Sequence, residues 1–340
     1  MKALYARGNF DIIVRETAMP VPVGDQVLIK VKACGLCGTD LHFAKDRQAD
    51  YTPLGHEIAG EIVDLGKSAA HYRIGDKVIV EDIAFCGVCP DCKNGHPSVC
   101  RKGPTLNGQP GMSEYLAVSA RLLNPFTDMD FCTASLVEPL AVSIHCTQNA
   151  RIPLGGSVVV YGPGPIGLMC VSLAKRLGAA RVALVGTTEK TAKGAVRLSA
   201  GRKMGADLTV AATETDPVSA ILDFFPGGAD SVIVTSPPAT LPSALKMVRY
   251  GGAVSLAGID LGGKDKVELS VNELIFNKMT LTTTFAEPAL MFPTAIKLLS
   301  QGLIDAQSII THTFTFAEAK DLIKRSFSGE EAMIKAVLIP

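Results

Sequence analysis

The first third of the chain contains short runs in which apolar and polar residues alternate. The clearest run is 26–33, where every second residue is apolar, and similar runs cover 57–64 and 77–81. Such an alternation places the apolar side chains on one side of an extended strand. Glycine and proline residues punctuate these runs, so this part of the chain predicts an antiparallel, β-rich domain.

From about residue 156, apolar runs alternate with segments of helical spacing. The predicted strands are 158–161, 181–185, 230–235 and 252–257, and the predicted helices are 166–177 and 242–249. Strands that alternate with helices are typical of βα units around a parallel sheet. After about residue 285 the pattern is mixed, with a helix expected at 292–299 and a strand at 334–339. We expect this tail to rejoin the first domain.

The chain has 340 residues, which is long enough for two domains. Its 33 Lys and Arg residues balance 33 Asp and Glu residues, and neither sign forms a long run. Because a nucleic acid or an anionic membrane surface would select a basic patch, this balance argues against both partners. We therefore expect the partner to be a small molecule.

Nothing in the sequence predicts secretion or membrane insertion. The first residues lack the apolar core and cleavage site of a secretory signal, and glycines and prolines interrupt the most apolar stretch, 158–174. We therefore expect a cytoplasmic protein with no membrane partner. In a reducing compartment, nine cysteines predict metal ligands and buried thiols rather than disulfides.

Four cysteines lie within fifteen residues, in the pattern C-x-x-C-x-x-C followed by a cysteine after seven more residues. They are Cys86, Cys89, Cys92 and Cys100. Four thiolates so close together can complete the tetrahedral shell of a zinc ion and leave no position for a substrate. The spacing therefore predicts a structural zinc site. An iron–sulfur cluster and a redox-active cysteine pair are the alternatives.

A second set of metal-ligating residue types is spread over the first half of the chain. It comprises Cys37, His56, Glu57 and Glu138. A thiolate, an imidazole and one or two carboxylates bind zinc and leave room for a water molecule or a substrate. An alcohol bound to such a zinc loses its proton near neutral pH and can then transfer a hydride to an acceptor. Glu57 and Glu138 both remain candidates for the carboxylate role at this catalytic site.

Two residues that follow Cys37 are candidates for moving the proton of the alcohol. Thr39 offers a hydroxyl that can accept the substrate proton. His42 can pass that proton to solvent, because histidine is a residue type that acts as a proton shuttle. Each of these residue types also occurs as an ordinary core or surface residue. Their joint occurrence with a nucleotide-binding motif is what indicates an active site.

A glycine-rich turn between a predicted strand and a predicted helix indicates nucleotide binding. The strand covers 157–161 and the helix covers 168–177. Glycines let such a turn tighten and let the backbone approach a pyrophosphate, whose charge lies at the N-terminus of the helix. We therefore expect this turn to bind NAD or NADP. Its residues are Gly162, Gly164, Pro165, Ile166 and Gly167.

The end of the second predicted strand bears on which coenzyme binds. An Asp or Glu at that place would bind the ribose hydroxyls of NAD, but the strand 181–185 runs into Gly186, Thr187 and Thr188. Thr187, Thr188 and Lys190 could instead receive the 2′-phosphate of NADP. The sequence therefore leans slightly toward NADP.

Together these motifs resemble the zinc-containing medium-chain dehydrogenase/reductase family, and within it the sorbitol (polyol) dehydrogenase branch. The matching segments are Cys-Gly-Thr-Asp-Leu-His at 37–42, Gly-His-Glu at 55–57, the four-cysteine segment 86–100 (the cysteine lobe), Glu-Pro-Leu-Ala-Val at 138–142, the glycine turn at 162–167 and Ile-Thr-His at 310–312. The resemblance implies one catalytic and one structural zinc ion. It also implies a homo-oligomer, either a tetramer or a dimer.

The resemblance further implies an α/β plus β fold with two domains. A GroES-like, β-rich catalytic domain would be formed by 1–148, which includes the cysteine lobe, and by 286–340. A Rossmann coenzyme domain with a doubly wound parallel sheet would occupy 149–285.

Residues that vary within the family bear on the substrate. Glu138, which precedes a proline, favours the polyol branch, and Phe43 falls where that branch usually has an aromatic residue lining the substrate site. Polyol enzymes typically read Phe-Arg-Tyr where this chain reads Phe-Ala-Glu at 285–287. The arginine expected to contact substrate hydroxyls is thus an alanine in this chain.

We therefore expect an enzyme that reversibly oxidises a secondary alcohol to its ketone with NAD or NADP. The substrate classes implied are a polyol, a sugar alcohol or a vicinal diol. An enzyme like threonine or butanediol dehydrogenase is the nearer alternative. A zinc-free reductase with the same fold would lack the ligand set, and a non-catalytic zinc-binding adaptor would not need the nucleotide motif.

Overall fold

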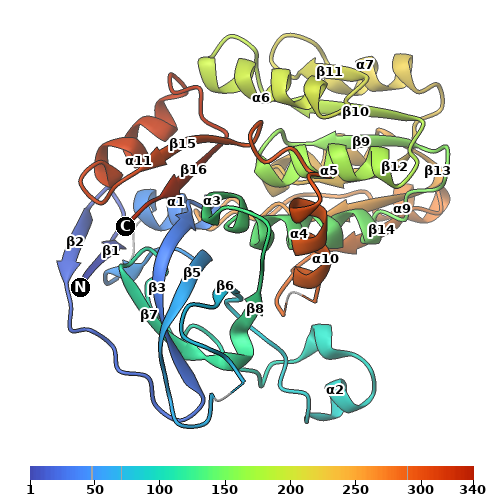
Figure 1. Ribbon diagram of the computed structural model, residues 1–340. Coiled ribbons are helices and arrows are strands. Elements are labelled where there is room, and N and C mark those ends of the chain that lie inside the picture. The colour runs from blue at the N-terminus through green and yellow to red at the C-terminus, as the bar shows by residue number, and fades with distance from the viewer. Residues whose placement is uncertain (47–48, 70, 289) are drawn as a thin grey trace. The chain divides into compact units, whose positions relative to one another are not determined.

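The chain forms two compact units, each assembled from separate parts of the sequence (Figure 1). Unit 1 contains Met1–Ala141, Ala286–Phe327 and Lys335–Pro340, and unit 2 contains Val142–Phe285 and Ser328–Ile334. The structure is a computed structural model that describes residues 1–46, 49–69, 71–288 and 290–340.

Unit 1 is built on two β-sheets. The larger sheet has seven strands in the order β15-β16-β3-β5-β6-β8, with β7 also paired to β3, and the smaller sheet has the order β2-β1-β4. The pairs β3–β5 and β5–β6 are antiparallel, as the alternating runs predicted. The strands are β1 (Lys2–Ala6), β2 (Ile12–Glu16), β3 (Gln26–Gly35), β4 (Thr52–Pro53), β5 (Glu57–Leu65), β6 (Lys77–Val80), β7 (Tyr115–Ser119), β8 (Leu123–Pro125), β15 (Ile310–Phe314) and β16 (Lys335–Leu338).

Short helices connect the strands of unit 1. Those that bear on the site are α1 (Gly38–Lys45), α2 (Pro90–Lys93), α3 (Phe131–Ala134), α10 (Phe292–Ser300) and α11 (Ala319–Ser328). Strand β3 shows why this region folds around a core. Its predicted apolar side is buried, and Leu28 and Cys34 on its other side are buried as well, while Lys30 is exposed. The helix α3 packs against β3, so the strand is covered more fully than an alternating pattern indicates.

Unit 2 contains a six-stranded sheet in the order β11-β10-β9-β12-β13-β14, and all of its pairings are parallel. The helices α5 and α6 pack against β9, β10 and β11 (Figure 1). The predicted doubly wound parallel sheet is thereby confirmed. The elements are β9 (Ser157–Tyr161), β10 (Arg181–Gly186), β11 (Leu208–Ala211), β12 (Ala229–Val234), β13 (Val248–Leu256), β14 (Thr280–Thr283), α5 (Pro165–Arg176), α6 (Ala192–Lys203), α7 (Pro217–Phe224), α8 (Leu241–Leu245) and α9 (Val271–Phe276). The helix α4 (Val137–Asn149) begins in unit 1 and continues into unit 2 from Val142.

The helix predicted at 242–249 is wrong over its second half. The helix α8 ends at Leu245, and β13 begins at Val248, which pairs with Ala229 of β12. Leu245 and Val248 are both buried and lie three residues apart. Apolar residues three positions apart are typical of one face of a helix, but here Leu245 belongs to α8 and Val248 belongs to β13.

The tail of the chain enters both units. Strand β16 pairs antiparallel with β3, through Val337 opposite Gly35 and Leu338 opposite Cys34. The preceding segment, 328–334, belongs to unit 2, which the sequence did not indicate. It is held there by backbone contacts with α6, such as the 3.1 Å bond from the Lys193 amide to the Gly329 carbonyl. The boundaries expected at 148 and 285 stay predictions.

Two further expectations concern the whole chain. No helix within the described residues is long and apolar enough to cross a membrane. All nine cysteines are free thiols, and three of them, Cys34, Cys146 and Cys170, are completely buried. Cys34 lies in the core of unit 1, so the expectation that it is a buried thiol rather than a metal ligand fits its position.

Candidate functional site

Cys37 and His56 are held in place by a buried aspartate of unit 1. Cys37 is the N-cap residue of α1, and its backbone N–H donates a 2.9 Å hydrogen bond to Oδ2 of Asp40. Oδ1 of Asp40 accepts a 2.8 Å bond from the amide of Gly55, which precedes His56. Asp40 therefore joins the two segments that carry the predicted ligands. Sequence reasoning missed this role, although an acidic residue three positions after an N-cap is a known capping signal.

The first candidate metal site brings together Cys37, His56 and Glu57. One ligand atom from each of these side chains lies within 4.8 Å of the ligand atoms of the other two. Burial lowers the pKa of His56, but the thiolate of Cys37 and the carboxylates of Asp40 and Glu138 raise it well above its usual value. The site thus concentrates negative charge around an imidazole. A thiolate, an imidazole and a carboxylate in this arrangement fit a zinc ion that keeps an open position.

Glu57 forms a buried ion pair with Lys335, which lies in strand β16 near the end of the chain. Nζ of Lys335 lies 2.6 Å from Oε1 and 2.8 Å from Oε2 of Glu57, and both side chains are almost completely buried. Burial lowers the pKa of Lys335, but Glu57, Cys37 and Glu138 raise it above its usual value. Gly35 leaves room for this pair, because a Cβ at that position would overlap Oε2 of Glu57. No sequence pattern indicated a role for this lysine.

Glu138 lies in the first turn of α4 and is buried, but it is not part of the three-residue metal group. Burial raises the pKa of Glu138 to about 8, His56 opposes that rise, and Asp82 and Glu57 add to it. Glu138 therefore interacts electrostatically with the metal-ligating residues without joining them. The structure places both candidate carboxylates in the region of His56.

Two more acidic residues of unit 1 interact with this region and were missed as site residues. Burial, and then a charge interaction and a hydrogen bond with Asp82, raise the pKa of Glu287 to about 8, whereas His56 lowers it. Glu287 belongs to the Phe-Ala-Glu segment in which the sequence departs from the polyol pattern. That departure was the one sequence feature from which Glu287 could have been predicted as a site residue. A carboxyl group thus accompanies the loss of the expected arginine.

The expected proton-relay residues lie on α1. Sγ of Cys37 is 3.8 Å from Oγ1 of Thr39, so the threonine hydroxyl lies next to a predicted metal ligand. Nδ1 of His42 is 2.7 Å from Oδ2 of Asp46, one helical turn later, which fixes the orientation of the imidazole ring. Phe43 follows on the same helix and is partly buried. Within the described hydrogen bonds, none joins Thr39 to His42.

The four-cysteine lobe surrounds α2 and has the dimensions of a zinc site. Sγ of Cys86 lies 3.9 Å from Sγ of Cys92, and Sγ of Cys89 lies 3.8 Å from Sγ of Cys100. Four Zn–S bonds of about 2.3 Å in a tetrahedron place the sulfur atoms roughly 3.8 Å apart. These separations are far too long for a disulfide bond. All four sulfur atoms lie within 4.8 Å of one another, which is too close for a multi-iron cluster, in which sulfide and iron atoms separate the thiolates.

Backbone amides prepare these sulfur atoms for a cation. The amides of Val88 and Cys89 donate to Sγ of Cys86, and the amide of Lys102 donates to Sγ of Cys100. The amide of Val88 is the main reason that the pKa of Cys86 is lowered to about 6, whereas burial raises the pKa of Cys92 to about 12. Amides that point at a thiolate stabilise its charge. The lobe therefore fits a metal that binds four thiolates.

The glycine turn of unit 2 follows β9 and opens α5, as predicted. Gly162 has a φ of 119°, which side chains rarely allow. At Gly167 a Cβ would overlap the carbonyl oxygen of Gly162, so this glycine permits close packing of helix and strand. Gly164 is the N-cap of α5, and a Cβ there would meet no atom within 4 Å. This open space before a helix N-terminus fits a pyrophosphate.

The carboxylate of Glu214, which follows β11, lies beside the turn after β10. Oε1 of Glu214 accepts a hydrogen bond from the hydroxyl of Thr188, and Oε2 accepts one of 3.2 Å from the amide of Glu189. Lys190 is exposed, and its amide donates to Oγ1 of Thr188. Glu214 thus supplies an acidic group near the end of β10, where the sequence lacks one. It was missed because it follows β11 rather than β10.

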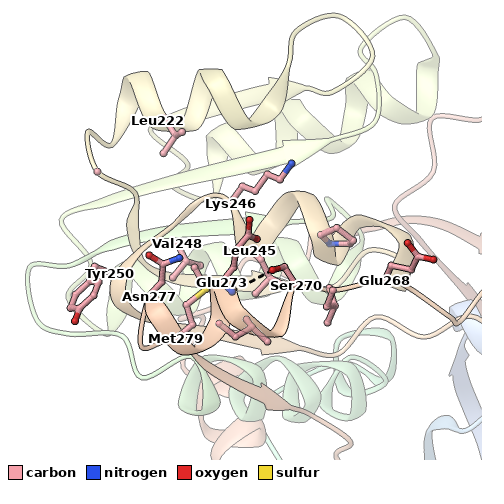
Figure 2. A pocket seen from close by; sticks show the side chains of 14 residues that line it. Leu222, Leu245, Lys246, Val248, Tyr250, Glu268, Ser270, Glu273, Asn277 and Met279 are labelled. Atoms are coloured by element: carbon pink, nitrogen blue, oxygen red, sulfur yellow. Dashed lines mark hydrogen bonds between the residues drawn. The ribbon is translucent and has the colours of Figure 1, made fainter.

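A hollow in unit 2 lies away from the predicted site residues. It has a volume of about 810 Å³ and lies beside α9 (Figure 2). Lys246, Tyr250, Glu273 and Asn277 are among its lining residues, and it includes no residue predicted from the sequence for the metal or the nucleotide. Its position on the outer elements of the sheet separates it from the glycine turn.

The chain is similar to known proteins along its whole length. Residues 24–128 match the family described as alcohol dehydrogenase GroES-like domain, and residues 165–301 match zinc-binding dehydrogenase. Sorbitol dehydrogenase of Bacillus subtilis is 31% identical, with 100% of this chain and 97% of the relative covered. L-Threonine 3-dehydrogenase of Bacillus velezensis is 32% identical, with 100% and 99% covered. The solved structure of an alcohol dehydrogenase from Thermus sp. ATN1 is 25% identical, with a TM-score of 0.89 and both chains fully covered.

The geometry of the lobe predicts the metal content of the protein. Mass spectrometry of the purified protein should find about two zinc ions per chain, and about one in Cys92→Ser, because a closed site needs all four thiolates. The matched control is Cys132→Ser, which alters a half-buried thiol outside both groups and should keep both ions. Hydrogen exchange at the amides of Val88 and Lys102 should be faster in Cys92→Ser. Iron-type visible absorption in the purified protein would overturn the zinc assignment.

Proposed function

The chain belongs to the zinc-containing medium-chain alcohol dehydrogenase family, and we propose that it oxidises a secondary alcohol of the polyol, sugar alcohol or vicinal diol class, reversibly, to a ketone. The observation that carries this proposal is the group Cys37, His56 and Glu57, with Thr39 beside the thiolate. It is a ligand set for a catalytic zinc rather than a structural one. The glycine turn of unit 2 supports NAD or NADP as the hydride acceptor.

Different residues of unit 1 are proposed to hold the metal and to move the proton of the alcohol. When bound, zinc supplies a Lewis acid that makes an alcohol proton easy to remove. Cys37, His56 and a carboxylate hold the ion, and Thr39 accepts the substrate proton. His42, with its ring fixed by Asp46, passes the proton toward solvent. Because Thr39 and His42 share no hydrogen bond, the proton needs a bridging hydroxyl or water between them.

For the carboxylate we propose Glu57 as the third ligand. Its oxygen lies within 4.8 Å of the ligand atoms of Cys37 and His56, whereas Glu138 is not part of that group. Glu138 is then the second carboxyl group, close enough to His56 to affect its pKa. We propose that Glu138 would hydrogen-bond a hydroxyl group of the substrate when Cys37, His56 and Glu57 hold the metal. In this proposal only Glu57 takes the ligand role for which the sequence left both carboxylates as candidates.

The acidic surroundings of the site bear on the substrate. Burial and Asp82 raise the pKa of Glu287, which means that further negative charge is unfavourable there. We propose that neutral polyols and diols, whose hydroxyl groups can bond to carboxyl groups, are accepted, and that sugar acids and sugar phosphates are poor substrates. Phe43 is proposed to line the same site. Threonine, whose ammonium group can bond to the same carboxyl groups although its own carboxylate is disfavoured there, is the second candidate substrate.

For the coenzyme we propose a revision of the slight lean toward NADP. Glu214 already accepts hydrogen bonds from Thr188 and from the amide of Glu189, so these donors are not free for a 2′-phosphate. A carboxylate at this place would also repel the phosphate. Thr187 and Lys190 stay exposed and could favour NADP. We propose that the carboxylate prevails and that NAD is the preferred coenzyme.

We also propose that the protein is a homo-oligomer in a reducing compartment such as the cytoplasm. Strand β14 is the outer strand of the sheet of unit 2, and the neighbouring helix α9 exposes Val271, Ile275 and Phe276. An unpaired strand edge beside apolar side chains favours pairing with a second copy of the chain. The hollow beside α9 adds shape to this surface (Figure 2). The nine free thiols support the choice of compartment.

The substitution Cys37→Ser tests the catalytic assignment. We expect turnover to fall below detection, because the thiolate ligand is lost, while the coenzyme still binds through unit 2. Nicotinamide absorbance with sorbitol, 2,3-butanediol, galactonate and threonine measures the first result, and calorimetric titration with NAD measures the second. The matched control is Cys34→Ala, a buried thiol outside the ligand group. Unchanged activity in Cys37→Ser would contradict the proposal.

The substitution Glu214→Gln tests the choice of coenzyme. The wild-type protein should bind NAD more tightly than NADP, and the variant should shift the ratio of dissociation constants toward NADP by about tenfold, since a like charge next to the phosphate is removed. The control is Glu189→Gln, a nearby carboxylate that pairs with Arg202 instead. A wild-type preference for NADP would contradict this proposal and support the preference for NADP that the sequence suggested.

The substitution Phe276→Glu tests the proposed oligomer. The side chain of Phe276 is 72% exposed, and a charge there should weaken the association of two apolar surfaces. Light scattering after size-exclusion chromatography should show a dimer or tetramer for the wild-type protein and a smaller species for the variant. Leu154→Glu, at a 90% exposed position of unit 2, is the control. A monomeric wild-type protein would be evidence against the interface.

A further inference from the structure

The ammonium group of Lys335 has three acceptors, all in unit 1. They are the two oxygens of Glu57, at 2.6 Å and 2.8 Å, and the carbonyl oxygen of Leu36, at 3.1 Å. A lysine ammonium has three N–H donors, so its hydrogen-bonding capacity is filled. Lys335 is also buried, with 3% of its surface exposed. It therefore acts on Glu57 and on no substrate or coenzyme.

We propose that Lys335 is the positioning residue that sets the orientation of Glu57 at the metal. Two contacts to one carboxylate fix the plane of that group as well as its place. Each oxygen keeps a lone pair for a cation, so Glu57 would present its carboxylate to a metal in one orientation. The inference rests on the proposed function, because it takes Cys37, His56 and Glu57 as the catalytic metal site.

The residues around the Lys335–Glu57 pair support the proposal that Lys335 orients the carboxylate of Glu57. Strand β3 lies between the two partners, because Gly35 pairs with Glu57 of β5 on one side and with Val337 of β16 on the other. The missing side chain of Gly35 opens the path between them. Residues that bond to a metal ligand from outside fix its geometry and affect metal affinity strongly. A buried ion pair by itself adds little net stability, so a purely structural link would be met as well by two apolar side chains.

Cobalt replacement gives a test that needs no substrate. Cobalt in place of zinc absorbs visible light in a way that depends on the number and geometry of its ligands. In Lys335→Met we expect the absorption of the catalytic site to change and its cobalt affinity to fall by about 10- to 100-fold. Lys335→Arg, which can still bind a carboxylate through two donors, should recover much of both. The cobalt-loaded Cys37→Ser protein supplies the absorption of the cysteine lobe for subtraction.

A second variant keeps the test valid if a lone buried carboxylate unfolds the protein. Glu57→Gln with Lys335→Met carries no unpaired charge, whereas Glu57→Gln alone leaves a buried lysine that can become neutral by losing a proton. The two variants should match in spectrum and affinity, because Lys335 acts only through Glu57. Lys175→Met is the matched control, since it breaks a 2.6 Å lysine–carboxylate pair in unit 2, with Asp207, and should change neither readout.

The outcomes separate this inference from the proposed function. If the wild-type protein binds two cobalt ions and Lys335→Met has the same spectrum and affinity, the positioning role is wrong and the function stands. If Lys335→Met adds to the effect of Glu57→Gln, Lys335 does not act through Glu57 and the inference also fails. If the wild-type protein binds cobalt only in the lobe, the catalytic site itself is absent, and both proposals are overturned.

Discussion

A buried charge must have a partner, and this constraint governs the centre of unit 1. Glu57 lies in the core at the start of β5, where an isolated carboxylate would be strongly unfavourable. Lys335 of β16 compensates that charge, so the tail strand, β3 and β5 must take one fixed register around Gly35. The position of the candidate ligands then follows from the sheet. Asp40 completes the arrangement by tying α1 to the loop before His56.

Local sequence patterns predicted the features that local chemistry determines. The strands β3, β5, β9 and β10, the glycine turn and the cysteine lobe each depend on neighbouring residues, and the structure shows all of them. The boundary between α8 and β13 was missed because apolar spacing is the same on a helix face and across two adjacent elements. Partners that are distant in sequence were missed for a different reason, since no local pattern connects Lys335 with Glu57.

The same distinction applies within the candidate sites. The types of ligand could be predicted for both metal sites, because zinc selects thiolates and imidazoles. The choice between two carboxylates could not, since it depends on which side chain the fold brings near Cys37. The residues at the end of β10 show this most clearly. The sequence lacks an acid at the end of β10, and the fold brings Glu214 to that place from the following βα unit.

The separation of Lys335 and Glu57 also matters while the protein is being made. The two residues are 278 positions apart in the sequence. The ribosome therefore releases the carboxylate long before its lysine, and in that interval the core of unit 1 would enclose an uncompensated charge if it closed. Glu57 can therefore be buried as a compensated ion pair only after β16, the last strand of the chain, has been made. The candidate metal site that contains Glu57 thus depends on nearly the whole sequence having been synthesised.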